Sequence, residues 1–429
     1  MAEWKEIRCK RSGECCYFLK HRSGLPIYVW PKRDYTTAYA VFATNYGAID
    51  VACLKGGAGE PVLLPAGTAH YLEHKLFENE DCDAFERYAE IGANANAYTS
   101  FDQTAYLFTC TQNLTESLEI LLDFVQKPYF TEKTVEKERG IIGQEIRMGE
   151  DSPFRRVFCN MLTGLYKEHP VHTDIAGTVE SIAQITPELL YSCYDTFYNL
   201  HNMVLAVSGN VTCEQVEAVA DRLLRPCEPK VPRRAPIDEP RESVTPRTEV
   251  AMPVAVPLFY LGYKVPLDTS QGLGSETPEA FAAAEVLEEL LGGRSSALYA
   301  SLMKQELINT SFDVEYFNGP GYGVWIVGGE SRDPDAVASA FRDEVARLRR
   351  EGVDPEEFAA ARNAVYGQMI GDLDNPESCG DLLIAAHMDG FGVFDLLEAV
   401  ASLTVEAVER RLATDFEERA SSLSIVSPL

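Results

Sequence analysis

The sequence contains no apolar stretch that approaches the roughly 20 consecutive residues needed to cross a bilayer. Residues 1–16 are polar and charged and lack the apolar centre of a secretory signal. We therefore expect no membrane partner and a cytoplasmic location.

The chain is also poor in positive charge. It has 38 lysines and arginines against 66 aspartates and glutamates, which gives a formal net charge of −28. Because phosphate backbones are bound by basic surface, this balance argues against a nucleic-acid partner. Solubility accounts for the excess acid, and an acidic chamber that prefers basic peptides is the alternative.

Paired cysteines with the C-x-x-C spacing are missing, although the chain contains 11 cysteines. Without a secretory signal, free thiols in a reducing cytoplasm are expected rather than disulfides. Cys9, Cys15 and Cys16 lie close together near the start, and a second metal site there is the less favoured alternative.

Histidine is scarce, with seven in 429 residues, yet two of them fall in the stretch His70-Tyr71-Leu72-Glu73-His74. Histidines four apart lie on one face of an α-helix, and two imidazoles at that spacing can bind one zinc ion. Glu73 projects toward the same side, where it could act as a base on water rather than as a ligand. The order H-x-x-E-H is the inverzincin signature.

A catalytic zinc site needs a third protein ligand, and residues 131–148 predict a helix that could supply it. Thr131 suits the N-cap, with acidic residues in the first turn. Glu138 and Glu145 are two turns apart and share a face. That face borders an expected apolar stripe of Val135, Ile141, Ile142 and Ile146. A solvated acidic helix is the simpler interpretation of this segment alone, but the upstream motif favours a metal site.

This constellation resembles the pitrilysin/insulinase family of zinc peptidases, which includes the mitochondrial processing peptidases. The resemblance covers essentially the whole chain, is strongest over residues 65–211, and is greatest to a half-length bacterial subgroup. It implies that His70, His74 and Glu145 bind Zn²⁺. It further implies that Glu73 is the general base and that Glu138 supports the site from the outer shell.

The resemblance extends to residues 92–100, which read Gly-Ala-Asn-Ala-Asn-Ala-Tyr-Thr-Ser. They are similar to an edge strand of the family, in which an Asn-Ala pair faces the substrate. Asn96 and Ala97 are therefore expected to contact an extended peptide that pairs with the strand. Asn96 as a simple turn residue is the alternative.

The organisation is typical of a duplication around a linker rich in proline and charge, residues 229–249. Similar segments recur in the same order, such as Leu205-Ala206-Val207-Ser208 and Leu423-Ser424-Ile425-Val426-Ser427. We predict an α+β fold of two homologous α/β-sandwich domains, each a sheet with helices on one face, as in the processing peptidases. The catalytic domain would span 1–228 and its homologue 250–429.

Comparison of the halves predicts that only the first binds metal. Gly143-Gln144-Glu145 aligns with Gly367-Gln368-Met369, and Glu138 aligns with Arg362 on the same offset. The H-x-x-E-H segment aligns loosely with Ser296 to Ala300, where no ligand remains. Methionine and alanine cannot hold zinc at such a site. The second half is expected to form one wall of a chamber.

Active relatives often carry an arginine and a tyrosine in the second half, which hold the substrate and the oxyanion. Met303 and Asn309 stand at those positions here. We therefore expect a partner chain to complete the enzyme. A heterodimer with a metal-free paralogue is favoured, and a homodimer is the alternative.

The predicted function is a zinc metalloendopeptidase that hydrolyses extended peptides or oligopeptides, with Glu73 as base. One alternative is a non-catalytic scaffold subunit, although such proteins usually lose a ligand or the base and this chain keeps the whole set. The other is a maturation protease specialised for one peptide precursor or modification pathway.

Overall fold

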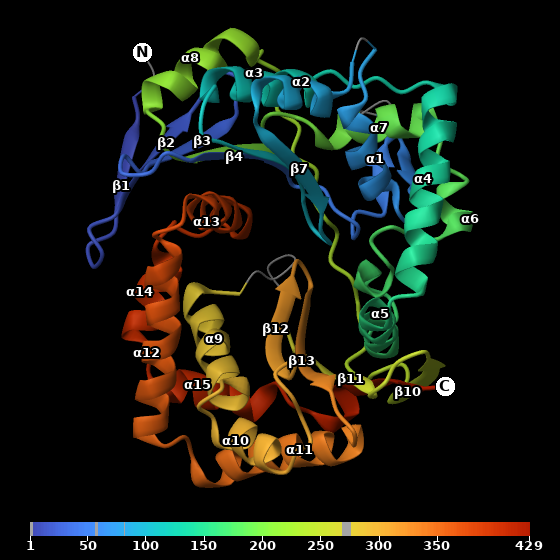
Figure 1. Cartoon of the computed structure of the whole chain (residues 1–429), viewed down its shortest axis with the longest axis vertical. Helices are drawn as coiled ribbons and strands as arrows, with labels where there is room; N and C mark the ends of the chain where they lie inside the picture. The colour runs from blue at the N-terminus through green and yellow to red at the C-terminus, as the bar shows by residue number, and fades with distance from the viewer. Residues whose placement is uncertain (1–2, 56–58, 81, 268–275) are drawn as a thin grey trace. The chain divides into compact units, whose positions relative to one another are not determined.

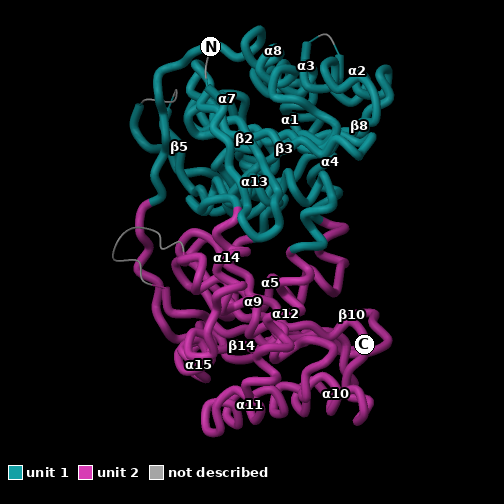
Figure 2. Tube along the Cα trace, turned by 90° about the vertical axis from the view of Figure 1, so that its left-hand side faces the viewer, with its two compact units in different colours: residues 1–146, 174–234, 370–393 teal, residues 147–173, 235–369, 394–429 magenta. Residues whose placement is uncertain are grey.

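The computed structural model describes residues 3–55, 59–80, 82–267 and 276–429. They form two compact units, each assembled from three stretches of chain (Figure 2). Unit 1 contains residues 1–146, 174–234 and 370–393, and unit 2 contains 147–173, 235–369 and 394–429. These units are defined by contacts in space, whereas the predicted boundary at residues 229–249 divides the sequence into its two repeats. That boundary stays a prediction. Residues 224–246, all described, form neither helix nor strand.

Unit 1 is built on a seven-stranded sheet with the order β1-β2-β3-β9-β4-β8-β7. Its strands are β1 (Lys5–Arg8), β2 (Cys15–Lys20), β3 (Pro26–Pro31), β4 (Ala38–Thr44), β7 (Asn94–Thr99), β8 (Thr104–Cys110) and β9 (Met203–Gly209). β4 and β9 are buried along their whole length. Such continuous apolar runs are typical of strands covered on both faces. β7 stands at the end of the sheet.

Helices cover both faces of this sheet. Figure 1 shows α2, α3 and α8 along one face and α13 against the other. Tyr39 Oη on β4 donates to Asp381 Oδ1 on α13 at 2.7 Å. The helices of unit 1 are α1 (Thr68–Phe77), α2 (Ala84–Ile91), α3 (Leu114–Phe124), α4 (Glu132–Glu150, whose last turn enters unit 2), α6 (Val179–Ile182), α7 (Pro187–Phe197), α8 (Cys213–Leu223) and α13 (Pro376–Asp389). A short hairpin is formed by β5 (Ala52–Leu54) and β6 (Pro61–Leu63).

Unit 2 repeats five of those seven strands, from β3 to the edge strand β7, as a sheet in the order β10-β14-β11-β13-β12. They are β10 (Arg247–Met252), β11 (Leu258–Lys264), β12 (Asp313–Gly319), β13 (Tyr322–Glu330) and β14 (Ser421–Pro428). The first pair is parallel and the other three are antiparallel. The run β3-β9-β4-β8-β7 has the same sequence of pairings. The predicted duplicated α+β sheet is thereby confirmed.

Each unit also contains one helix from the other half of the sequence. In unit 2 this is α5 (Pro153–Leu165), which packs on β14 and β11. The approach is close, because a Cβ on Gly262 of β11 would lie 2.7 Å from the Leu165 side chain. The counterpart of α5 in unit 1 is α13. The two helices correspond in the sequence repeat, because the offset of 224 that relates Gly143 to Gly367 also relates the start of α5 to the start of α13 to within one residue. We expected helices on one face of each sheet only. The helices α13 and α5 form a second layer that this expectation missed.

The remaining elements of unit 2 pack around its sheet. They are η2 (Pro170–His172), α9 (Pro278–Gly292), α10 (Ala297–Lys304), α11 (Pro334–Glu351), α12 (Pro355–Asp372, whose last turn enters unit 1), α14 (Asp395–Ser402), α15 (Val405–Thr414) and η3 (Glu418–Ala420).

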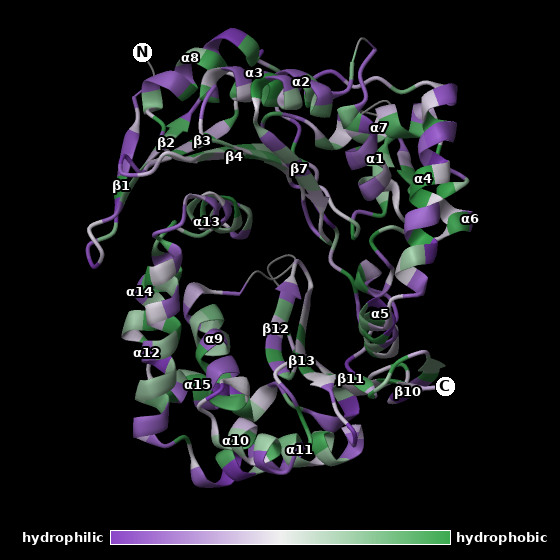
Figure 3. Cartoon of the chain, viewed as in Figure 1, coloured by the Kyte–Doolittle hydropathy of each residue, from purple (hydrophilic) through white to green (hydrophobic). Residues whose placement is uncertain are grey.

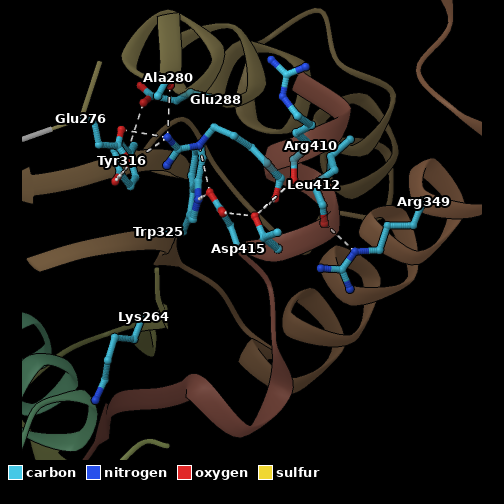
Figure 4. A network of polar contacts seen from close by, with 12 residues as sticks. Lys264, Glu276, Ala280, Glu288, Tyr316, Trp325, Arg349, Arg410, Leu412 and Asp415 are labelled. Atoms are coloured by element: carbon cyan, nitrogen blue, oxygen red, sulfur yellow. Dashed lines mark hydrogen bonds and ion pairs between the residues drawn. The ribbon is translucent and has the colours of Figure 1, made fainter. Parts of the chain in front are cut away.

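A nearly buried ionic network lies between α9, α15 and this sheet (Figure 4). Arg411 pairs with Glu276 at 2.8 Å and with Asp415 at 2.9 Å. Trp325 Nε1 donates to Asp415 Oδ2 at 3.0 Å, and the Arg411 guanidinium lies 4.3 Å from the centre of the Tyr316 ring. Charges so far from water are tolerated because each one has a partner.

The helices carry hydrophobic and hydrophilic positions along their length (Figure 3). In α8, for example, the buried residues Val216, Val219 and Ala220 recur at helical spacing. Among the described residues, no helix is long and apolar enough to span a membrane.

Candidate metal and catalytic site

The H-x-x-E-H motif lies on α1, as the spacing predicts. Two glycines fix where this helix begins. Gly67 has a φ of +89°, and a Cβ there would come within 2.4 Å of the Ala176 carbonyl oxygen. Gly177, with φ +70°, makes the reciprocal approach, 2.3 Å from the Ala66 oxygen. Only glycine suits both positions, so the start of α1 is held against the loop before α6.

The Glu138–Glu145 segment lies on α4, which begins one residue after the expected N-cap. Thr131 Oγ1 accepts from the Thr134 amide at 3.2 Å, as an N-cap does. Hydrogen bonds join α4 to its surroundings: Tyr71 Oη of α1 donates to the Val135 carbonyl, and Arg139 Nη2 donates to the Ile185 carbonyl at 3.0 Å. The motif helix and the second helix are therefore bonded directly to each other.

One member of the predicted apolar stripe on α4 is wrong. Val135, Ile142 and Ile146 are buried, but Ile141 is 47% exposed. At three residues from Glu138 and four from Glu145, Ile141 falls on the face of the two carboxylates. That face looks toward the candidate site rather than toward the core.

His70, His74 and Glu145 converge, with one ligand atom from each lying within 4.8 Å of the others. His70 Nε2 is 3.4 Å from Glu145 Oε1, and His74 Nε2 is 3.6 Å from Glu145 Oε2. Zinc bonds of 2.0–2.1 Å in a tetrahedron place neighbouring ligand atoms about 3.4 Å apart. Two imidazoles and a carboxylate at these separations therefore fit zinc. No other such group occurs in the described part of the chain, and Cys9, Cys15 and Cys16 do not form one.

Glu138 lies behind His74. Its Oε1 is 3.0 Å from His74 Nδ1, and the Glu138 side chain is nearly buried. A carboxylate on Nδ1 holds the imidazole with Nε2 free to bind a metal. His70 Nδ1 is also buried, but it has no hydrogen-bond partner among the described residues. Of the two Nδ1 atoms, only that of His74 has a hydrogen-bond partner among the described residues.

The electrostatics around His74 favour a cation. Burial pulls the pKa of His74 down, but the hydrogen bond with Glu138 and the charges of Glu73, Glu138 and Glu145 outweigh it, so the pKa is raised. The same concentration of carboxylates would stabilise a divalent ion.

Glu73 projects from α1 into the same region and is 8% exposed. Burial raises the pKa of its carboxyl above the usual value, although His70, His74 and a hydrogen bond from Thr99 act in the opposite direction. Thr99 Oγ1 donates to Glu73 Oε2 at 2.9 Å. A buried carboxyl beside two candidate metal ligands is suited to proton transfer.

Asn96 and Ala97 lie on β7, at the end of the sheet, so the expected edge position is observed. Asn96 is exposed, and its Oδ1 accepts from the Ala97 amide at 2.9 Å. A substrate contact by this pair stays a prediction.

The positions expected to carry arginine and tyrosine lie in unit 2. Met303 is on α10 and 37% exposed. Asn309 Nδ2 donates to Glu330 Oε2 at 2.7 Å, and its Oδ1 accepts from Ser311. Neither side chain provides the charge of arginine or the phenol of tyrosine that the resemblance predicts at these positions.

Thr99 and Tyr71 were not singled out by the sequence analysis. Tyr71 lies inside the motif and reads there as a core residue. Thr99 lies in the segment compared with the edge strand, and the sequence carries no signal for its contact with Glu73 because that contact depends on how β7 packs against α1.

The chain is similar to known proteins over most of its length. Residues 60–179 match the family described as insulinase (peptidase family M16), and residues 184–365 match the peptidase M16 inactive domain. The chain is 39% identical to an uncharacterized zinc protease, YmfH, of Bacillus subtilis (strain 168), over 94% of this chain and 95% of that one. It is 24% identical to a probable mitochondrial-processing peptidase subunit beta of Arabidopsis thaliana, over 85% of this chain and 71% of that one. A crystal structure of an M16-like peptidase from Alicyclobacillus acidocaldarius superposes with a TM-score of 0.91 at 34% identity, covering 100% of this chain and 99% of that one.

Proposed function

Since the chain belongs to the M16 family of zinc peptidases, we propose that it is a zinc-dependent endopeptidase whose site lies between α1 and α4. The observation that carries the proposal is the convergence of His70, His74 and Glu145 within 4.8 Å, with the Glu73 carboxyl on the same helix as both histidines. These three residues would hold Zn²⁺ and leave a position open for water.

When bound, zinc supplies a Lewis acid that lowers the pKa of water and polarises the carbonyl of the scissile peptide bond. Glu73 takes a proton from the attacking water and later delivers a proton to the leaving amine nitrogen. Its burial supports both tasks, because a raised pKa brings the carboxyl nearer to the working pH.

The ligands need support of their own. Glu138 accepts from His74 Nδ1, which keeps the proton off Nε2 and turns that nitrogen toward Glu145. The hydrogen bond from Tyr71 to the Val135 carbonyl fixes how far α4 can slide along α1, and thereby positions Glu145.

The substrate would be an extended peptide that adds a strand to the free side of β7. An edge strand offers backbone donors and acceptors to any sequence, so affinity would come from the main chain and selectivity from side-chain pockets. The exposed Asn96 and the neighbouring Ala97 are the contacts we propose on β7.

A partner chain would complete the enzyme. Met303 and Asn309 stand where the resemblance predicts an arginine and a tyrosine, and we propose that a second chain supplies these functions. One relative is described as a subunit, which supports assembly with a second chain. We propose a metal-free paralogue as that chain, and a second copy of this protein is the alternative.

A non-catalytic role is less well supported. The match to the inactive-domain description covers residues 184–365, whereas the candidate ligands and base all lie before residue 146. The complete ligand set supports catalysis, and a maturation protease with one precursor would use the same site.

Metal removal and restoration tests the proposal. Cleavage of a quenched peptide library should stop after treatment with a chelator and return on adding one equivalent of zinc per chain. Cleavage that survives complete removal of zinc would contradict it. Zinc binding without cleavage, by the chain alone or with a co-purified partner, would favour the scaffold role.

A further inference from the structure

The carboxyl of Glu73 is held by a single hydroxyl group. Thr99 Oγ1 donates to Glu73 Oε2 at 2.9 Å, and among the described residues this is the hydrogen bond that the Glu73 side chain receives. A buried carboxylate with one partner can turn about its last torsion unless that partner is itself rigid.

The proton of Thr99 has two possible acceptors, and the geometry selects one. Thr104 Oγ1, directly across the strand pair, is 3.5 Å away, whereas Glu73 Oε2 is 2.9 Å away. A hydrogen bond to a carboxylate is also the stronger kind. The Thr104 hydroxyl is already committed, because it donates to the Tyr46 carbonyl at 2.8 Å.

Thr99 is held firmly on its own account. It is the last residue of β7 and pairs with Thr104, which is fully buried on β8. A β-branched side chain in a strand has few χ1 choices, so its hydroxyl keeps one direction. The Thr99 hydroxyl therefore fixes the Glu73 carboxyl of α1 relative to β7.

We propose that Thr99 is the positioning residue of the general base. Its hydroxyl fixes the plane of the Glu73 carboxylate through Oε2 and leaves Oε1 to exchange protons with water and the leaving amine. Thr99 ends the strand proposed to bind the substrate, so the base is positioned from that strand. This inference rests on the proposed role of Glu73.

The test compares Thr99→Val, which keeps the shape but removes the hydroxyl, with Thr99→Ser, which restores the hydroxyl. Thr104→Val is the matched control, since it makes the same change across the strand pair and leaves Glu73 its donor. Zinc content, kcat and KM for a quenched peptide would be measured for each, with the partner chain present if cleavage requires it. Glu73→Gln tests the proposed role of Glu73 as base separately from the positioning role of Thr99.

We expect Thr99→Val to lower kcat roughly 10- to 100-fold, the range for loss of a hydrogen bond to a charged group. Its KM and its zinc content should stay within about twofold of wild type, because Thr99 touches neither the ligands nor the peptide side chains. Thr99→Ser should recover most of the rate, and Thr104→Val should keep it.

A readout independent of activity is the Glu73 conformation in crystals of the metal-free protein. Wild type and Thr99→Ser should show one carboxylate position in contact with the hydroxyl, and Thr99→Val should show a different or a divided one. If Glu73→Gln is inactive, two results would overturn the inference about Thr99. These are an unchanged position of the Glu73 carboxylate in Thr99→Val, and a kcat of Thr99→Val equal to that of wild type. Cleavage by Glu73→Gln would instead reject the role of Glu73 itself.

Discussion

Glu138 offers the sharpest test of how the site is built, because it touches a candidate ligand and not the metal position. Its Oε1 lies 3.0 Å from His74 Nδ1, on the far side of the ring from Nε2. Glu138→Gln keeps the size and leaves an amide oxygen that can still accept this proton. It removes the charge that makes the bond strong and the imidazole more basic.

The expected loss in zinc affinity is about 10- to 100-fold, the usual effect of changing an outer-shell partner, or about 1.4–2.7 kcal/mol. Glu145→Gln should cost more, because it replaces a charged ligand by a neutral one. Glu136→Gln is the control: it lies two residues away on α4, but its side chain is 70% exposed and its contact is a surface pair with Arg139.

Zinc affinity would be measured by competition with a chromophoric chelator, and thermal unfolding of the metal-free proteins would show whether the fold is intact. The order of affinities should be Glu136→Gln, then Glu138→Gln, then Glu145→Gln. Equal losses for Glu138→Gln and Glu145→Gln would mean that the inner and outer positions are misassigned. An unchanged affinity in Glu138→Gln would refute the supporting role.

Three further predictions concern stability and can be checked by urea or thermal unfolding. Gly67→Ala should lower the free energy of unfolding by about 1–3 kcal/mol, since φ is +89° and the new Cβ would meet the backbone of Ala176. Gly140→Ala is the control: nothing lies within 4 Å of its new Cβ on α4, so it should stabilise the protein by about 0.5–1 kcal/mol. Arg411→Met should cost about 3–5 kcal/mol because it removes the cation from two nearly buried carboxylates, Glu276 and Asp415, and a loss below about 1 kcal/mol would contradict this. Burial lowers the pKa of His387 to about 4, with Lys20 adding to the effect, so the unfolded chain takes up a proton first on acidification. Stability should therefore fall by about 2 kcal/mol from pH 7.5 to pH 5, a part that His387→Gln should remove.

The features that could be predicted from sequence are those written in local spacing. The H-x-x-E-H interval, the N-cap at Thr131 and the two-turn interval between Glu138 and Glu145 all describe one helix at a time, and each is found where expected. Ile141 was misplaced because periodicity marks a face as apolar without saying whether it meets the core or a site.

The features that escaped prediction depend on tertiary pairing. The bond from Thr99 to Glu73 exists because β7 packs against α1, and neither segment's sequence indicates that contact. The exchange of α5 and α13 between the units is likewise invisible, since a repeat in sequence shows which segments correspond but not which sheet each one covers.

The central claim is that Glu73 is the base of a zinc site, and one pair of measurements addresses it directly. Zinc per chain and kcat on a quenched peptide would be determined for wild type and Glu73→Gln, with the partner chain present if it is required. One zinc in both proteins, with a rate lower by about 100- to 10,000-fold in the variant, is the result we predict. Equal rates in the two proteins, or the absence of zinc from carefully prepared wild type, would contradict the account.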